Sequence, residues 1–202
     1  MNEPAHNYSR TRYGGGVVNQ RTRDMLVAAE KINGHPFTLT QGSYNKGVSA
    51  SAGTHDGGGV VDISVGGMDG AQRNAAVQAL RRVGFFAWLR TPPSFAYHIH
   101  AVAIGDREMS PSARNQVKQG FADRDGLARH GPDPAPDPYP AWTAKYGKHA
   151  SPDPAPAGPG PVVYVVNGPT GKFVTQTDNP QVWAAEALKI LDRHGKVGGY
   201  KR

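Results

Sequence analysis

Four residues of this chain have side chains and spacings that could do chemistry together: His55, Asp62, His98 and His100. The histidines of His98-Ile99-His100 are two positions apart, so on a β-strand they point to the same face, about 6–7 Å from each other. This spacing allows one imidazole to bind a metal ion while the other stands beside the water on that ion. A hydrolytic zinc site needs three protein ligands and one open position. His55, Asp62 and one histidine of the pair would supply the three ligands.

The seven-residue separation of His55 and Asp62 requires a bend in the chain. On a straight strand the two residues would lie about 23 Å apart. The glycines at 57–59 provide the freedom for the chain to double back. They do not predict a phosphate-binding loop, because a strand pattern follows them where a helix would be needed. The sequence contains no cysteine, so any zinc ligands must be His, Asp or Glu.

His100 is the better third ligand, and His98 then becomes the candidate base. Coordination to zinc lowers the pKa of a water molecule towards about 7, and an imidazole is well matched to that value. None of the four glutamates, at 3, 30, 108 and 186, is adjacent to a ligand. This argues against a glutamate base, although Glu108 and Asp56 remain alternatives.

The pattern of apolar residues predicts an α+β fold with antiparallel strands up to residue 130. One helix is expected from the cap Asn19 to Gly34, with Met25, Leu26, Ala29 and Ile32 on its apolar face. A second helix should start at Asp69 and end near Gly84, and a third should run from Ser110 to about Gly120. Strands are expected over residues 37–40, 60–64, 85–89 and 97–104.

Ten of the seventeen prolines fall in residues 131–161, which predicts an extended linker. The aromatic island 142–146 within it is a candidate for docking onto a neighbouring domain. Residues 162–202 should form a small basic module with a β-hairpin and a helix over about 180–193. The predicted domains are therefore 1–130, a linker over 131–161, and the small basic module 162–202.

His-x6-Asp followed by a distant His resembles the motif of the superfamily that joins lysostaphin-type peptidases, D-Ala-D-Ala metallopeptidases and the Hedgehog signalling domain. The resemblance implies a zinc ion bound by His55, Asp62 and His100. The segment from Gln41 to His55 is similar to the one preceding the first ligand in the D-Ala-D-Ala carboxypeptidase and L-alanyl-D-glutamate endopeptidase branch. That branch places a Glu three residues before the last ligand, where this chain has Tyr97. The His-x-His arrangement is instead lysostaphin-like, so the subfamily and the bond cleaved stay open.

The resemblance also implies roles around the metal. In the carboxypeptidase and endopeptidase branch an Arg or Gln polarises the scissile carbonyl, and Gln41 is the candidate here. The expected activity is a zinc-dependent peptidase that cuts peptidoglycan stem peptides, with His98 activating the water. Trp88, Arg90 and Tyr97 are expected to line the substrate groove, with Arg90 placed to meet a peptide carboxylate.

The net charge of +7 and the absence of a signal or transmembrane pattern bear on the biological setting. A catalytic domain with a proline-rich linker and a basic tail fits a phage endolysin that is made in the cytoplasm and reaches the wall during host lysis. A bacterial wall-remodelling carboxypeptidase is the alternative. A basic surface is also attracted to anionic cell-wall polymers. A zinc-containing module without catalysis is a second class of function. Binding of nucleic acid is not expected, because no recognised motif accompanies the charge.

Overall fold

The computed structural model describes residues 1–136, 139–147, 162–168 and 171–177 of the chain. The chain divides into two compact units, Met1–Ser151 and Pro152–Arg202. The first unit is built on a four-stranded antiparallel sheet with the strand order β3-β4-β6-β5. The strands are β3 (Leu39–Gln41), β4 (Val60–Ser64), β5 (Phe85–Arg90) and β6 (His98–Ala103). The predicted α+β class with a central antiparallel sheet is confirmed.

Three main helices pack on this sheet: α1 (Gln20–Asn33), α2 (Gly70–Arg82) and α3 (Pro111–Phe121). Each begins after the predicted cap, whose side-chain oxygen accepts a hydrogen bond from a backbone N–H of the first turn: Asn19, Asp69 and Ser110. Gly34 ends α1 in the left-handed conformation. The prediction for Ile32 was wrong: it is 42% exposed, because it lies in the last turn of α1 beyond the part that packs on the sheet.

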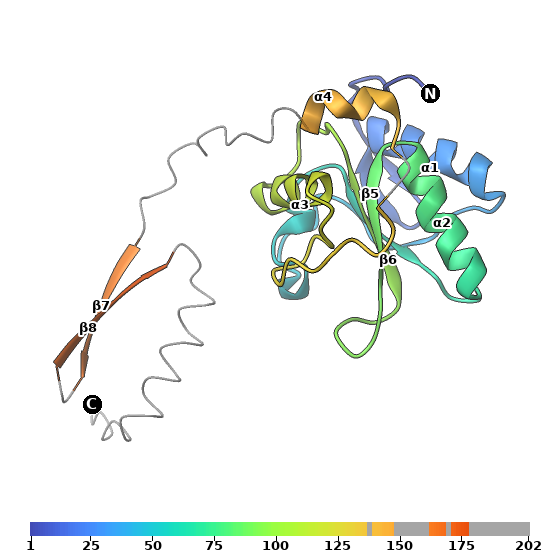
Figure 1. Cartoon of the computed structure of the whole chain (residues 1–202). Coiled ribbons are helices and arrows are strands. Elements are labelled where there is room, and N and C mark those ends of the chain that lie inside the picture. Colours follow the sequence, from blue (N-terminus) through green and yellow to red (C-terminus); the bar gives the residue numbers. More distant parts are fainter. Residues whose placement is uncertain (137–138, 148–161, 169–170, 178–202) are drawn as a thin grey trace. The chain divides into compact units, whose positions relative to one another are not determined.

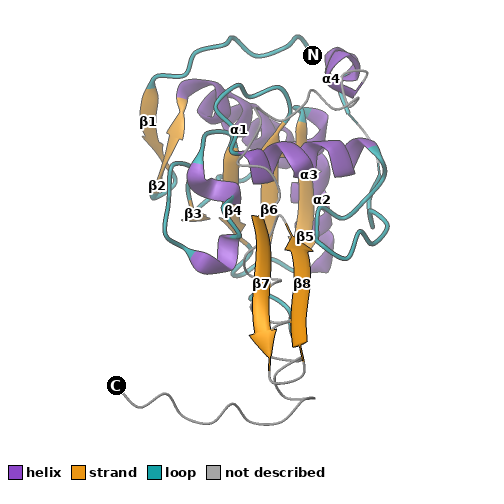
Figure 2. Cartoon of the chain, turned by 90° about the vertical axis from the view of Figure 1, so that its left-hand side faces the viewer, coloured by secondary structure: helices purple, strands orange, loops and turns teal. Residues whose placement is uncertain are grey.

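The two faces of the sheet carry two separate hydrophobic cores. Val61, Ile63 and Ile99 face α1 and α2, whereas Val60 and Val102 face α3. Figure 1 shows α1 and α2 on one side of β5 and β6 and α3 on the other, and Figure 2 shows α3 crossing its face of the sheet. Because side chains alternate along a strand, the same periodicity places Asp62, His98 and His100 on the α3 face.

A short N-terminal hairpin, β1 (Arg10–Tyr13) and β2 (Gly16–Asn19), was not predicted from the sequence. Its turn contains Gly14 with φ 55, in the left-handed region. A Cβ on Gly14 would lie 2.9 Å from the carbonyl oxygen of Phe37. The turn therefore depends on glycine both for its backbone conformation and for its approach to the chain leading into β3.

The first unit continues past residue 130, so the predicted domain boundary was too early. Asp133 is fully buried at its side chain, where both carboxylate oxygens accept hydrogen bonds from Nη2 of Arg81 at 2.8 and 2.9 Å. Arg81 is equally buried and also donates to the carbonyl oxygens of Ala87 and Ala135 and to the hydroxyl of Tyr139. A buried ion pair of this kind marks packed structure, not a solvated linker.

The aromatic island predicted to dock does pack on the first unit. A Cβ added to Gly84 would overlap the ring of Trp142, and one added to Gly105 would overlap the ring of Tyr146. Trp142 precedes the short helix α4 (Ala144–Gly147), in which Tyr146 donates a hydrogen bond to Glu3. Residues 139–147 are therefore part of the domain in which the candidate site lies.

In the second unit, β7 (Val162–Gly168) and β8 (Gly171–Thr177) form the predicted antiparallel hairpin. The helix expected over 180–193 lies outside the described residues. Among the described helices, none combines the length and the apolar character that crossing a membrane requires.

Candidate metal centre

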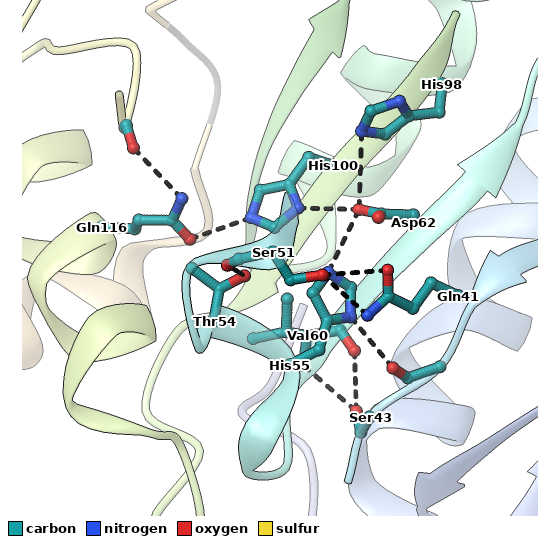
Figure 3. Close-up of polar contacts among 12 residues, drawn as sticks. Gln41, Ser43, Ser51, Thr54, His55, Val60, Asp62, His98, His100 and Gln116 are labelled. Atoms are coloured by element: carbon teal, nitrogen blue, oxygen red, sulfur yellow. Dashed lines mark hydrogen bonds and ion pairs between the residues drawn. The ribbon is translucent and has the colours of Figure 1, made fainter. Parts of the chain in front are cut away.

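Three side chains from separate elements converge on the α3 face of the sheet. His55 lies in a short 3₁₀ helix (Thr54–Asp56), Asp62 on β4 and His100 on β6. Nε2 of His55 lies 3.3 Å from Oδ1 of Asp62, and Nδ1 of His100 lies 2.7 Å from the same oxygen. One ligand atom from each residue falls within 4.8 Å of the other two (Figure 3). The sequence prediction that these three residues meet is confirmed.

Strand register brings Asp62 and His100 together, and the glycine loop adds His55. Asp62 and His100 are directly paired partners in β4 and β6, so their side chains share one face. A Cβ on Gly57 would overlap the carbonyl of Glu108, and Gly59 has φ 78. The loop can therefore double back and pack tightly against residues 106–110 only with glycine at these positions.

Hydrogen bonds fix which nitrogen of each imidazole faces the centre. Nδ1 of His55 donates to the carbonyl oxygen of Gly42 at 2.9 Å, which leaves the lone pair of Nε2 towards Asp62. Nε2 of His100 donates to Oε1 of Gln116 at 2.9 Å, which leaves its Nδ1 towards the same carboxylate. The amide of Gln116 is itself oriented, because its Nε2 donates to the carbonyl oxygen of Gly126 at 3.1 Å. Such outer partners are typical of metal-binding histidines.

Gln116 is a residue of the candidate site that the sequence did not reveal. It lies on α3, and no spacing in the sequence connects it with His100. Only the packing of α3 across the sheet brings the two side chains together. The single available signal was a polar residue on the buried side of a predicted helix, and Gln116 is 8% exposed.

The electrostatics of the group fit a cation. Burial by itself would raise the pKa of Asp62, but its contacts with the imidazoles of His100 and His55 outweigh burial and hold that pKa well below its usual range. Burial lowers the pKa of His100, which favours the neutral imidazole. Nε2 of His55 is buried and has no hydrogen-bond partner, a costly arrangement unless another species binds it. The His55–Asp62–His100 group could therefore bind a metal ion.

His98 stands beside this group, on the same face of β6 as His100. Its Nε2 lies 3.7 Å from Oδ1 of Asp62, and its side chain is 18% exposed. Nδ1 lies 2.8 Å from the carbonyl oxygen of Ala96 and donates to it, so the lone pair is on Nε2. His98 thus presents a proton acceptor towards the His55–Asp62–His100 group and remains accessible to water.

Gln41 also reaches this face, through an irregularity that the sequence did not predict. A register shift between Leu39 and Gln41 leaves Leu39 in the opposite core but pairs Gln41 with Asp62. The Gln41 amide donates to Oγ of Ser51 at 2.9 Å. Its N–H group therefore lies at the edge of the His55–Asp62–His100 group, as Figure 3 shows.

A pocket of about 630 Å³ opens over the centre, and it tests the predicted substrate residues. His98, Gln41 and Arg90 line it. Trp88 does not line it, because α3 packs against its ring and leaves it only 1% exposed. The ring stacks instead on that of His100, with the two centroids 6.3 Å apart. Tyr97 does not line it either. Tyr97 comes one residue before His98, and side chains alternate between the two faces along a strand, so its side chain points away from the face that carries His98. It is 50% exposed and lies under the guanidinium of Arg73.

The alternative bases lie away from this pocket. Glu108 accepts a hydrogen bond from the hydroxyl of Tyr44. Neither Glu108 nor Asp56 is among the residues that line the pocket. Of the candidate bases, His98 is therefore the one that the described structure places nearest to the His55–Asp62–His100 group.

No model of a protein family matches this chain, and neither a curated protein nor a solved structure does.

Proposed function

We propose that this protein is a zinc-dependent peptidase that hydrolyses peptide bonds of bacterial peptidoglycan. The single observation that carries the proposal is the orphaned Nε2 of buried His55, which faces Asp62 and His100 below an open pocket. A structural metal site is closed by four protein ligands, whereas a catalytic zinc site keeps one position open. Three converging donors below a pocket match the second arrangement.

The donor set favours zinc over other ions. Two neutral imidazoles and one carboxylate suit a borderline metal such as zinc, whereas magnesium and calcium prefer sites made of oxygen atoms. His55 would bind through Nε2, His100 through Nδ1 and Asp62 through Oδ1. When bound, zinc would supply a Lewis acid that polarises a peptide carbonyl and makes a water molecule more acidic.

The chain's own residues then divide the remaining work. The unprotonated Nε2 of His98 accepts the proton of the attacking water and returns it to the leaving amine. Nδ1 of His98 stays bonded to the carbonyl oxygen of Ala96, which holds the ring in this tautomer. The Gln41 amide turns from Ser51 to donate a hydrogen bond to the developing oxyanion.

The choice of peptidoglycan as substrate rests on the resemblance of the His-x6-Asp and His-x-His motifs to wall peptidases. The positive net charge supports attraction to a polyanionic wall. Delivery to the wall after phage release, and binding of the wall by residues 162–202, are parts of the same proposal.

The test combines metal content with product analysis. The full-length protein should contain one zinc per chain by elemental analysis and should release fragments from purified peptidoglycan, whose masses identify the bond cleaved. His55→Ala should lose both zinc and activity, and His98→Gln should keep zinc but lose activity. His35→Ala, at an exposed histidine outside the site, is the matched control. Zinc binding without release of any fragment would instead indicate a zinc-containing binding module.

A further inference from the structure

Tyr44 has a backbone conformation that a large side chain rarely adopts. Its φ is 58, in the left-handed region. For a residue other than glycine this conformation costs free energy, because Cβ comes too close to the following carbonyl oxygen. Such strain persists only where surrounding contacts fix it, and it is concentrated at functional sites. The contacts that fix Tyr44 therefore indicate what this residue does.

The turn at Tyr44 lays its neighbours along the segment that carries His55. The backbone N–H of Tyr44 donates to the carbonyl oxygen of Gly57 at 2.9 Å. The backbone N–H of Asn45 donates to the carbonyl oxygen of His55, also at 2.9 Å. In the opposite direction, Nδ1 of His55 donates to the carbonyl oxygen of Gly42 at 2.9 Å. Three hydrogen bonds thus join the two segments, and the last of them leaves Nε2 of the imidazole free to bind a metal ion.

The side chain of Tyr44 packs directly against the glycine loop. Its hydroxyl donates to a carboxylate oxygen of Glu108 and accepts a hydrogen bond from Nδ2 of Asn19 at 3.2 Å. A Cβ on Gly58 would lie only 2.7 Å from the hydroxyl oxygen of Tyr44 and 2.8 Å from Nδ2 of Asn19. The guanidinium carbon of Arg10 lies 4.2 Å from the centroid of the tyrosine ring. The loop is therefore held by a clamp that consists of Tyr44, Asn19 and Glu108.

The partners of this clamp are themselves fixed. Asn19 is fully buried, and its Nδ2 also donates to Oδ2 of Asp106 at 2.8 Å. Its Oδ1 accepts the backbone N–H of Thr22 at 2.8 Å, at the start of α1. Burial and the hydrogen bond to Glu108 raise the pKa of Tyr44 above its usual value, so the hydroxyl keeps its proton and remains a donor at neutral pH. The clamp thus ties the loop to the rigid start of a helix.

We propose that Tyr44 is a positioning residue for His55, whose Nε2 it keeps turned towards Asp62 by holding the turn and the glycine loop in place. This inference rests on the metal-binding part of the proposed function. Tyr44 is not among the residues that line the pocket, so it acts through the backbone and not by touching a substrate. A ligand that is already oriented binds its metal more tightly, because no freedom of the ring is lost on binding.

The first experiment measures the Kd for zinc of the full-length protein by competition with a chelator. Tyr44→Phe removes only the hydroxyl and should raise this Kd about 10-fold. Tyr13→Phe is the matched control, because its hydroxyl also donates to a glutamate, Glu30 on α1, at 2.5 Å. The control should leave the Kd unchanged. An unchanged Kd in Tyr44→Phe, or an equal rise in both variants, would overturn the inference.

Two further changes separate the clamp from the turn. Glu108→Gln keeps an oxygen that accepts the hydroxyl of Tyr44 and should retain the zinc affinity, whereas Glu108→Ala should weaken it as Tyr44→Phe does. Tyr44→Gly suits the left-handed conformation better than tyrosine does, but it loses the clamp, so its Kd should rise as well. If Tyr44→Gly binds zinc as tightly as the unmodified protein, residue 44 serves the turn alone and the inference is wrong.

Nuclear magnetic resonance of the metal-free protein separates this inference from the proposed function. The Nδ1–H of His55 is bonded to a carbonyl oxygen and should give an imidazole signal that exchanges slowly with water. Tyr44→Phe should broaden or remove this signal, and Tyr13→Phe should preserve it. If this pattern is found in a protein that binds no zinc, the positioning of His55 stands and the proposed function fails. A signal that Tyr44→Phe leaves unaffected refutes the positioning role, whether or not zinc binds.

Discussion

The buried pair of Arg81 and Asp133 should carry a large part of the stability of the first unit. Asp133→Ala removes the carboxylate that accepts two hydrogen bonds from Arg81 and leaves a guanidinium with no exposed surface and no counter-charge. Breaking a buried pair from one side costs about 3–5 kcal/mol. The total free energy of unfolding of a domain is about 5–15 kcal/mol, so this loss would leave the unit marginal.

Urea and thermal unfolding, each followed by circular dichroism, measure this loss. At roughly 2–4 °C per kcal/mol for a unit of this size, the melting temperature should fall by about 6–20 °C. Asp24→Ala removes an exposed carboxylate from the ion pair with Arg23, in which the side chains are 42% and 49% exposed, and it should cost about 1 kcal/mol or less. The double variant Arg81→Met/Asp133→Leu should regain stability over Asp133→Ala, because no charge is left buried without its partner.

The same variant tests where the domain ends. The loop 126–129 lines the pocket, and Asp133 holds the chain just after that loop. If Asp133→Ala unfolds within 1 kcal/mol of the unmodified protein, the segment after residue 130 is not clamped, and the original prediction of a linker there would be the better account.

Three further outcomes are expected. Removing metal with a chelator should lower the melting temperature, and a hundredfold excess of zinc over its Kd should restore about 2.7 kcal/mol; an unchanged melting curve would contradict a bound metal. Gly84→Ala should lower the free energy of unfolding, measured in urea, more than Gly34→Ala does. Both glycines have positive φ, but only at Gly84 does the new methyl group meet Trp142. Equal costs would argue against docking of that ring. Gln116→Ala should weaken zinc binding about 10- to 100-fold in a chelator competition, because His100 loses its acceptor, and an unchanged Kd would exclude this role.

Much of the fold could be predicted because its signals are local. Caps at Asn19, Asp69 and Ser110, together with the alternation of apolar residues, mark helices and strands within a few residues of where they occur. The hairpin β1–β2 escaped because its strands are only four residues long and do not alternate clearly between apolar and polar residues. The proline-rich composition after residue 130 was misleading, because the pairing of Asp133 with Arg81 is set by contacts between residues far apart in the chain.

For the candidate site, the sequence by itself determined the types and the strand alternation of the residues that meet. An aspartate and a histidine on predicted strands, with a second histidine just before the glycine turn at 57–59, were enough to predict the His55–Asp62–His100 group. The tertiary structure alone decided which nitrogen of each imidazole faces the centre, that Gln116 supports His100, that Trp88 is buried and that Tyr97 points away from the pocket. The physical reason is that side-chain type and periodicity are encoded along the chain, whereas hydrogen-bond partners and burial depend on how α3 and the loops pack across the sheet.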